Sequence, residues 1–297
     1  MKLVRCCGKK GECYDVWLDD RLVCLPRLAK QLGKTLPERL EDFISSDARG
    51  VKMSEELLED ATENQIKHVT IPFREECLLA PIAFPPKIIC LGFNYRDHIK
   101  EQNAAIPDEP IIFMKPHTSI IGSGANIVKP SFVKQLDYEA ELAIVMGRRA
   151  KNVAVSEAES CIFGYTILND VSARDIQFKD KQWTRGKGFD TFAPTGPCIT
   201  TADQLQDTSD LRIRTWVNGE LRQNSTTKNM LFNVFEIVHH LSRVMTLEPC
   251  DIIATGTPSG VGFALKPHPQ FLEDDDIVRI EIEGIGVLEN RVVEEKS

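Results

Sequence analysis

Three acidic residues, Asp137, Glu139 and Glu141, alternate with apolar residues in the segment QLDYEAELAIV (135–145). Because strand side chains alternate between two faces, this pattern predicts a strand with one apolar face and one acidic face. Neighbouring carboxylates on the acidic face would stand ~7 Å apart. A solvated face tolerates such charges at little cost, whereas a buried face needs a cation to offset repulsion and desolvation. The segment is therefore either the solvent-exposed edge of a sheet or part of a metal site.

A fourth carboxylate, Asp170, ends the apolar segment GYTILND (164–170), and the end of a strand is a common position for a functional carboxylate. If the next residues, SARDIQF (172–178), open a helix, then Asp170, Arg174 and Gln177 lie on one face of it. An ordinary surface ion pair between Asp170 and Arg174 would explain the same spacing. The segment therefore predicts either a salt-bridged surface helix or part of a site.

Two glycine-rich segments are the next candidates. In RGKGFD the flanking glycines allow Lys187 to sit in a tight, exposed turn, which favours a functional cation. The segment ATGTPSGVGF (254–263) lacks the Lys and the following helix of a phosphate-binding loop. It is not a nucleophile elbow either, because Ser259 stands one place too late. It is either a plain turn or a loop whose backbone N–H groups bind an anion, with Thr257 adding a hydroxyl.

The segment GFNYRDHIKEQN (92–103) places His98 and Glu101 three residues apart, on one side of a predicted short helix. A carboxylate at that spacing orients an imidazole and raises its basicity, which suits a general base. An exposed helical ion pair is the alternative explanation. The pair is therefore a candidate for moving protons, and its burial decides between the two.

The composition excludes several classes of function. The 297 residues carry a formal net charge of −8 with Lys and Arg scattered, which argues against nucleic acid as the main partner. No apolar run reaches the ~18 residues of a membrane-spanning helix, so no membrane partner is expected. Nine scattered cysteines without a CxxC motif predict reduced thiols rather than a disulfide framework or a zinc site. The N-terminus lacks the apolar core of a secretory signal, so the cytosol is the default compartment.

These candidates must be positioned by two unequal parts of the chain. Residues 1–82 predict a small α/β domain, and its expected elements are strands at 2–7 and 14–18 and helices at 25–33, 36–46 and 54–65. Prolines at 81, 85 and 86 then interrupt the chain, and the domain boundary is placed near residue 82.

Residues 83–297 contain mainly strand patterns. These lie at 87–91, 110–115, 138–146, 164–171, 197–201, 211–219, 251–256 and 276–293. The Asn218-Gly219 pair is the strongest hairpin signal, and residues 233–247 predict one helix. Many strands with few helices indicate an α+β, β-rich fold rather than an alternating βαβ array.

The motifs occur in a recognisable order along the chain: NYxxHxxE, FxKP, YExEL, NDxSxRDxQ, GKxFD and GTPxGVG. In this order they resemble the fumarylacetoacetate hydrolase family over residues ~85 to 295. The resemblance implies a mixed β-sheet roll preceded by a small α/β domain. It also implies a homodimer, and it adds the mitochondrial matrix as an alternative compartment.

The resemblance assigns Glu139, Glu141 and Asp170 as ligands of Mg2+ or Mn2+, which answers the question of the paired glutamates. Hard oxygen ligands without Cys or His suit Mg2+. Asp137 stands outside this triad and is expected to be an outer or surface group.

The remaining roles implied by the resemblance follow the charge layout. Lys187 supplies positive charge to an enolate, and His98 with Glu101 forms a lid dyad that activates water in hydrolytic members. The substrate-binding positions are Lys115, Arg174, Gln177 and Thr257.

The expected substrate is a small 2-oxo acid, and one metal-stabilised enolate serves several reactions. Oxaloacetate keto–enol tautomerisation is the first choice. Hydrolysis of acylpyruvate or fumarylacetoacetate-type diketones and decarboxylation of oxaloacetate are the alternatives. A non-catalytic metal-binding protein is the distant alternative, because it should have lost part of this constellation.

Overall fold

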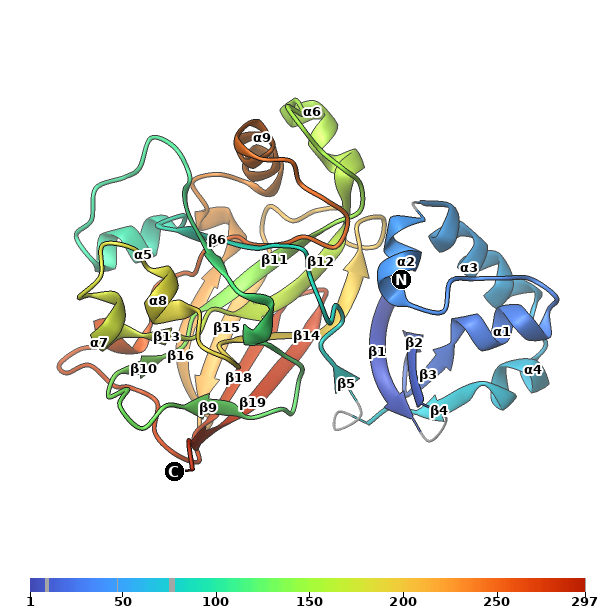
Figure 1. The fold of residues 1–297 in the computed structure, drawn as a ribbon, viewed down its shortest axis with the longest axis horizontal. Coiled ribbons are helices and arrows are strands. Elements are labelled where there is room, and N and C mark those ends of the chain that lie inside the picture. The colour runs from blue at the N-terminus through green and yellow to red at the C-terminus, as the bar shows by residue number, and fades with distance from the viewer. Residues whose placement is uncertain (9–10, 47, 75–77, 297) are drawn as a thin grey trace.

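One large mixed sheet joins the N-terminal strands to the rest of the chain in this computed structural model (Figure 1). The structure describes residues 1–297 except 9–10, 47, 75–77 and 297. The strand order is β4-β3-β2-β1-β14-β12-β11-β17-β6-β7, with β5 beside β1 and β8 beside β14. The strands of this sheet are β1 (Lys2–Gly8), β2 (Gly11–Leu18), β3 (Arg21–Cys24), β4 (Thr70–Pro72), β5 (Leu78–Leu79), β6 (Ile88–Gly92), β7 (Ile111–Lys115), β8 (Ile120–Ile121), β11 (Ala140–Met146), β12 (Ile162–Asn169), β14 (Ala193–Thr201) and β17 (Ile252–Ala254).

A second sheet, ordered β16-β15-β18-β19-β9, completes the roll, and β10 pairs with β13 beside it. These strands are β9 (Ile127–Lys129), β10 (Leu136–Asp137), β13 (Ser172–Ala173), β15 (Arg212–Val217), β16 (Glu220–Thr226), β18 (Ile277–Ile282) and β19 (Gly286–Glu294). Asn218 and Gly219 have φ values of 51° and 81° between β15 and β16, as a tight hairpin turn requires. The predicted hairpin is therefore present.

The helices are short and lie around the sheets. They are α1 (Leu25–Gln31), α2 (Leu40–Ser45), α3 (Ala48–Asp60), α4 (Glu63–His68), α5 (Arg96–Glu101), α6 (Val155–Ala158), α7 (Arg174–Gln177), α8 (Thr184–Lys187) and α9 (Val234–Val244). Single 3₁₀ turns are η2 (His117–Ser119), η3 (Glu159–Cys161), η4 (Thr227–Asn229) and η5 (Gly262–Ala264). Helix α9 begins with a capping box between Asn233 and Glu236, and its apolar side is buried.

Both faces of the large sheet are buried, which gives two apolar clusters. Along β11, Leu142 and Ile144 belong to one cluster, and Ala143 and Val145 belong to the other. The first cluster includes residues of the five-stranded sheet and of α9, such as Ile280. The second includes the N-terminal helices. The large sheet therefore packs against the five-stranded sheet on one face and against the N-terminal helices on the other, so side chains on a central strand such as β11 are shielded from water.

The predicted fold class, α+β and β-rich with a mixed sheet roll, is confirmed. The helix predicted over 54–65 is instead two helices, α3 and α4. The chain breaks there because Thr62 caps α4 and exchanges hydrogen bonds with Gln65. The domain boundary near residue 82 stays a prediction.

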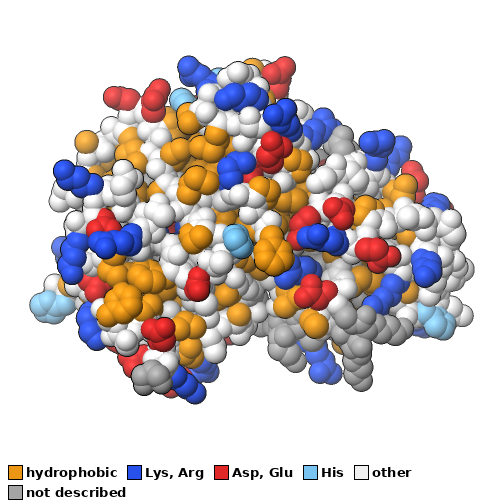
Figure 2. Space-filling model, viewed as in Figure 1, with side chains coloured by type: hydrophobic (Ala, Val, Ile, Leu, Met, Phe, Trp, Pro, Cys, Tyr) orange, Lys and Arg blue, Asp and Glu red, His pale blue; other side chains and the backbone are white. Residues whose placement is uncertain are grey.

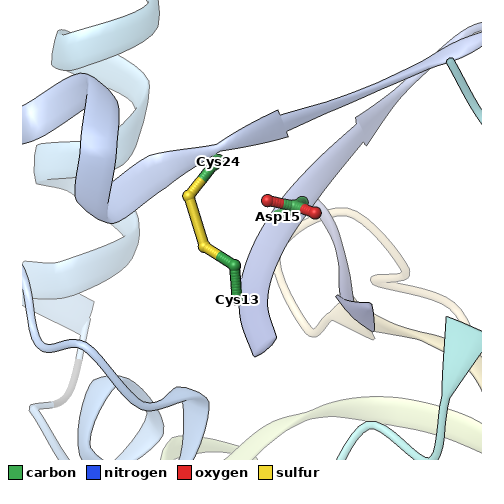
Figure 3. Close-up of side chains that lie close together, drawn as sticks. All are labelled: Cys13, Asp15 and Cys24. Carbon is green, nitrogen blue, oxygen red and sulfur yellow. A yellow bond between two sulfur atoms is a disulfide. The ribbon is translucent and has the colours of Figure 1, made fainter. Parts of the chain in front are cut away.

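The expectation of reduced thiols is wrong at one place, because Cys13 and Cys24 form a disulfide between β2 and β3 (Figure 3). Cysteine spacing could not reveal this pair, because strand pairing, not sequence distance, brings the two residues together. Cys77 lies outside the described residues.

Basic and acidic side chains are interspersed on the face shown in Figure 2. Among the described residues no helix is long and apolar enough to cross a bilayer.

Candidate functional site

The three predicted metal-binding carboxylates meet at one point of the large sheet. Glu141 lies in β11, Asp170 directly follows β12, and Glu139 precedes β11. One carboxylate oxygen from each lies within 4.8 Å of the other two, and all three side chains are buried. The sequence pattern predicted one continuous strand from residue 138 to 146, but the strand begins at Ala140. The break lets Glu139 turn toward Asp170.

Side chains fix this break in the strand. The Glu139 N–H donates to Asn169 Oδ1 at 3.0 Å, and the Ala140 N–H donates to Gln223 Oε1 at 3.0 Å. Gln223 comes from β16 and is fully buried. Neither amide could be predicted from local sequence patterns, because their partners are distant in the chain.

Lys187 bridges two of the three carboxylates. Its Nζ donates to Glu139 Oε2 and to Asp170 Oδ2, both at 2.6 Å. Burial alone would lower the pKa of Lys187, but Asp170 and Glu139 raise it above its ordinary value, so the side chain stays a cation. Helix α8 comes close enough because Gly186 stands where a Cβ would lie 2.7 Å from the backbone of Gln177.

Lys115 and Arg174 add two more buried cations. Lys115 Nζ lies 2.5 Å from Asp170 Oδ1, and it also donates to the Val171 carbonyl at 3.2 Å. Arg174 lies 2.7 Å from Glu139 Oε1 through its NH2 group. Although burial raises the pKa of Glu139, Lys187 and Arg174 together hold it well below its ordinary value. The surface ion pair considered for Asp170 and Arg174 is therefore wrong: both are buried, and each pairs with other residues.

Glu141 is the member of the triad that forms no ion pair with a described Lys or Arg. Its Oε2 accepts from the Gly256 N–H at 2.7 Å, and its Oε1 is buried without a hydrogen-bond partner among the described residues. Burial and the neighbouring Asp170 and Glu139 raise the pKa of Glu141 well above its ordinary value. An unpartnered buried carboxylate oxygen beside two others fits a hard divalent cation.

The glycine-rich loop after β17 proves to be an anion-binding loop, but its anions are carboxylates of the protein. The Gly256 N–H donates to Glu141, the Gly260 N–H to Glu101 at 2.9 Å, and the Gly262 N–H to Asp137 at 2.7 Å. Gly260 has φ +100°, and a Cβ there would lie 2.2 Å from the Arg222 carbonyl oxygen. The loop thus ties three acidic side chains to one backbone segment.

Asp137 is therefore not a surface group. It is fully buried, and besides the loop amides it accepts from Arg174 Nε at 2.9 Å. Arg174 also donates to Gln177 Oε1 at 2.9 Å, as their predicted spacing on one helix face allows. Asp137 positions Arg174, a role that sequence reasoning missed because it depends on a loop 125 residues away.

His98 and Glu101 form the predicted pair, with His98 Nδ1 3.1 Å from Glu101 Oε2. His98 is 6% exposed, which excludes the alternative of an exposed ion pair. Gln102 Nε2 lies 2.6 Å from His98 Nε2. The carboxylate favours the tautomer with its proton on Nδ1, and the lone pair on Nε2 then faces the Gln102 amide. Sequence reasoning had not singled out Gln102.

A cavity of about 200 Å³ connects these groups. Predicted site residues on its wall are His98, Glu139, Arg174, Gln177, Lys187 and Thr257. Its apolar wall is formed by Leu91, Phe93, Phe113, Phe178, Trp183 and Phe263. Four predicted site residues lie behind this wall, and each contacts a residue of the wall or a carboxylate of the triad. They are Glu101, Lys115, Glu141 and Asp170.

Thr257 is held rigidly at this wall. Its hydroxyl donates to the Ala140 carbonyl at 3.0 Å and accepts from Gln223 Nε2 at 2.8 Å.

Lys115 differs from the other predicted substrate-binding residues, since its charge is directed at Asp170. A volume near 200 Å³ is below the ~300–1,000 Å³ of sites for drug-sized ligands, so the cavity suits a small acid.

The family model described as "Fumarylacetoacetate (FAA) hydrolase C-terminal" matches residues 87–293, the part of the chain that holds every residue of this site. The chain belongs to the fumarylacetoacetate hydrolase family. Curated relatives cover more of it. A Dictyostelium discoideum protein named "Fumarylacetoacetate hydrolase domain-containing protein 2 homolog" is 44% identical, with 87% of each chain aligned.

A Bos taurus protein named "Oxaloacetate tautomerase FAHD2B, mitochondrial" is 42% identical over 87% of this chain and 81% of its own. Among solved structures, a fumarylacetoacetate hydrolase from psychrophilic Exiguobacterium antarcticum matches with a TM-score of 0.82 and 37% identity. That match covers 99% of this chain and 100% of the other. The similarity therefore includes the N-terminal strands and helices.

Proposed function

We propose that this protein is a metal-dependent enzyme that interconverts the keto and enol forms of a 2-oxo dicarboxylic acid, with oxaloacetate as the substrate. The charge layout around the cavity carries this proposal. With a divalent cation bound, four ionised buried carboxylates and three buried cations leave one net positive charge, which attracts an anionic acid. The relative named oxaloacetate tautomerase supports the same reaction.

Glu139, Glu141 and Asp170 are the proposed ligands of Mg2+ or Mn2+, and Asp137 keeps its role of holding Arg174. When bound, the cation would act as a Lewis acid that stabilises negative charge on the substrate's keto oxygen. Three carboxylates without sulfur or imidazole suit either of these hard cations.

The chain's own residues then divide the remaining work. Arg174 and Gln177 would hold a substrate carboxylate at the cavity wall, where both side chains are already fixed by each other. Lys187 would add positive charge next to the developing enolate. His98, with Nδ1 bonded to Glu101, would move the proton between carbon and solvent through Nε2 once Gln102 releases it.

Hydrolysis of an acylpyruvate or fumarylacetoacetate-type diketone is the second candidate function. The intact His98–Glu101 pair favours it, because such a pair can deprotonate the attacking water. The similarity to a solved fumarylacetoacetate hydrolase supports the same candidate. Decarboxylation of oxaloacetate shares the enolate but needs no such base.

A substrate panel tests the assignment. Purified protein is given oxaloacetate and an acylpyruvate, with and without Mg2+, and enol absorbance, CO2 release and pyruvate are followed separately. We expect Mg2+-dependent loss of the enol form without CO2. Faster cleavage of the acylpyruvate than equilibration of oxaloacetate would replace this proposal with the hydrolase function. No turnover of any substrate would favour a non-catalytic metal-binding protein.

Four further proposals accompany the function and rest on the family resemblance or the sequence. They are a homodimeric assembly, a small N-terminal domain ending near residue 82, a small-molecule partner only, and a cytosolic location with the mitochondrial matrix as the alternative.

A further inference from the structure

A second group of side chains that could bind a metal lies on the N-terminal strands β2 and β3, far in sequence from the carboxylates of Glu139, Glu141 and Asp170. Cys13, Asp15 and Cys24 each offer a ligand atom within 4.8 Å of the others. Figure 3 shows the Asp15 side chain beside the disulfide that joins Cys13 to Cys24. Cys6 approaches the same point, and its Sγ donates to Asp15 Oδ2 at 2.6 Å.

Strand pairing places all four side chains on one face of the sheet. Cys6 of β1 stands opposite Cys13 of β2, and Asp15 of β2 stands opposite Cys24 of β3. Opposed residues in antiparallel strands project to the same side, and residues two apart on one strand also do so. Cys6, Cys13, Asp15 and Cys24 therefore converge from three adjacent strands. Cys7, the next residue on β1, projects to the opposite face.

The surroundings are unusual for a carboxylate. Asp15 is 2% exposed, and burial raises its pKa despite the Cys6 thiol and the nearby Arg27. Of the sulfur ligands, Cys24 and Cys6 are buried and Cys13 is half-buried, beside a surface cavity that Phe84 and Glu41 also line. A small ion can reach the cluster through this cavity, whereas its inner ligands are shielded from water.

We propose that Cys6, Cys13, Asp15 and Cys24 bind one thiophilic divalent cation, such as Zn2+, when the Cys13–Cys24 disulfide is reduced. Thiolates with one carboxylate are ligands that Zn2+ accepts in four-coordinate sites. Sulfur ligands of a tetrahedral Zn2+ stand ~3.8 Å apart, and the ligand atoms of Cys13, Asp15 and Cys24 already lie within 4.8 Å of one another. Cys6 is held beside this group by its hydrogen bond to Asp15.

Disulfide and metal site are alternative states of the same sulfur atoms. A dithiol donates two electrons and two protons, the Cys13–Cys24 bond breaks, and the dithiol becomes a disulfide. The cation then displaces the thiol protons into solvent. Oxidation of Cys13 and Cys24 reverses these steps and expels the ion. The bound ion would join β1, β2 and β3. Its binding is redox-dependent because the disulfide and the ion use the same sulfur atoms.

Cobalt distinguishes this site from the catalytic carboxylates. The full-length protein is prepared with the disulfide intact and after reduction with a phosphine, and each sample is titrated anaerobically with Co2+. Only a thiolate-bound Co2+ gives an intense sulfur-to-metal charge-transfer absorption, and the catalytic triad contains no sulfur. We expect one equivalent of Co2+ to saturate this absorption in the reduced protein, and Zn2+ to remove it.

The oxidised protein should show no such absorption, since two of the sulfur atoms are then bonded to each other. Absence of the absorption in reduced protein whose circular dichroism is native would overturn the proposal. An equal absorption in the oxidised protein would overturn it too.

Single substitutions test the ligand set. Cys24→Ser and Cys6→Ser should each weaken Co2+ binding and lower the absorption by roughly a third, as expected for two thiolates in place of three. Asp15→Asn should weaken Co2+ binding by at least ~10-fold. The matched control is Cys7→Ser on the opposite face of β1, which should leave the absorption unchanged. Loss of the absorption in Cys7→Ser would refute the assigned face.

Discussion

The large sheet carries two buried polar clusters with opposite chemistry. Around β11 and β12, the carboxylates of Glu139, Glu141 and Asp170 lie among Lys and Arg side chains and offer oxygen atoms to a metal ion. Across β1, β2 and β3 the cluster is mainly sulfur, with Asp15 as its single carboxylate. Oxygen ligands select Mg2+ or Mn2+, and thiolates select Zn2+ or a similar ion. The donor atoms, rather than burial, therefore decide which ion each cluster can hold.

The two clusters are also held in different ways. Backbone amides of the glycine-rich loop and three cations hold the carboxylates through hydrogen bonds and ion pairs that are present without a ligand. The sulfur cluster depends on strand pairing and on one covalent bond, which a reductant can remove. The first arrangement suits catalysis, which requires preorganised charge, and the second suits a switch.

The largest expected effect on turnover comes from removing the hard cation. EDTA should abolish tautomerase activity, and Mg2+ or Mn2+ should restore it, because Lys187 alone cannot replace a divalent charge beside Glu141. Turnover of the enol form of oxaloacetate and bound metal are measured on the same sample. Full activity in demonstrably metal-free protein would contradict the assignment.

A matched pair of variants sharpens this result. Glu141→Ala should lose the catalytic metal and remain folded, since burying that carboxylate without a cation costs electrostatic energy. Asp15→Asn in the sulfur cluster should keep full activity with Mg2+. If both variants lose activity equally, the two clusters do not act independently.

The next effect concerns the proton-transfer pair. His98→Ala removes the base that Glu101 orients, and hydrolysis of a diketone should fall by the ~10²- to 10⁴-fold typical of a lost general base. Tautomerase activity should fall as well, and decarboxylation should not. Metal content is measured in parallel and should equal that of the wild type, because His98 hydrogen-bonds to Glu101 and Gln102 and to none of the three carboxylates in the described structure.

A smaller loss is expected at Lys187. Lys187→Met removes a cation that bridges Glu139 and Asp170 and faces the cavity. Its attraction is stronger for the enolate than for the ketone, so kcat should fall by ~10²-fold with little change in KM. Steady-state kinetics with saturating Mg2+ measure both constants. A change confined to KM would assign Lys187 to substrate binding instead.

Local sequence patterns predicted much of the fold and of the catalytic centre. Alternating apolar residues located β11, a continuous apolar segment located β12, and the Asn218-Gly219 turn located a hairpin. The spacing of His98 and Glu101 on α5 predicted a contact that the structure contains. These features depend on residues close together in the chain, so their periodicity is visible in the sequence.

Features that depend on distant residues were missed. The sequence offered no reason to join Asp137 to Gly262, Gln223 to Thr257, or Cys13 to Cys24. The strand break at Glu139 was also missed, because side chains from β12 and β16 create it. Tertiary hydrogen bonds override local propensity at such positions, and they occur where the site is built.

The smallest expected effect on turnover comes from reducing the Cys13–Cys24 disulfide. The bond closes a loop with a sequence separation of 11 residues, so its loss should lower the free energy of unfolding by about 3 kcal/mol. Activity at 25 °C with Mg2+ should stay unchanged, because no catalytic residue lies in β1, β2 or β3. Urea midpoints of oxidised and reduced protein, with activity assayed alongside, measure both quantities.

Zn2+ should restore part of the lost stability in the reduced wild type, since an ion that binds only the folded state stabilises it. The gain should be smaller in Cys24→Ser, which has lost both the disulfide and a ligand. A loss of activity on reduction that Zn2+ fails to reverse would show that the sulfur cluster acts on the catalytic centre, and would break the separation between the two.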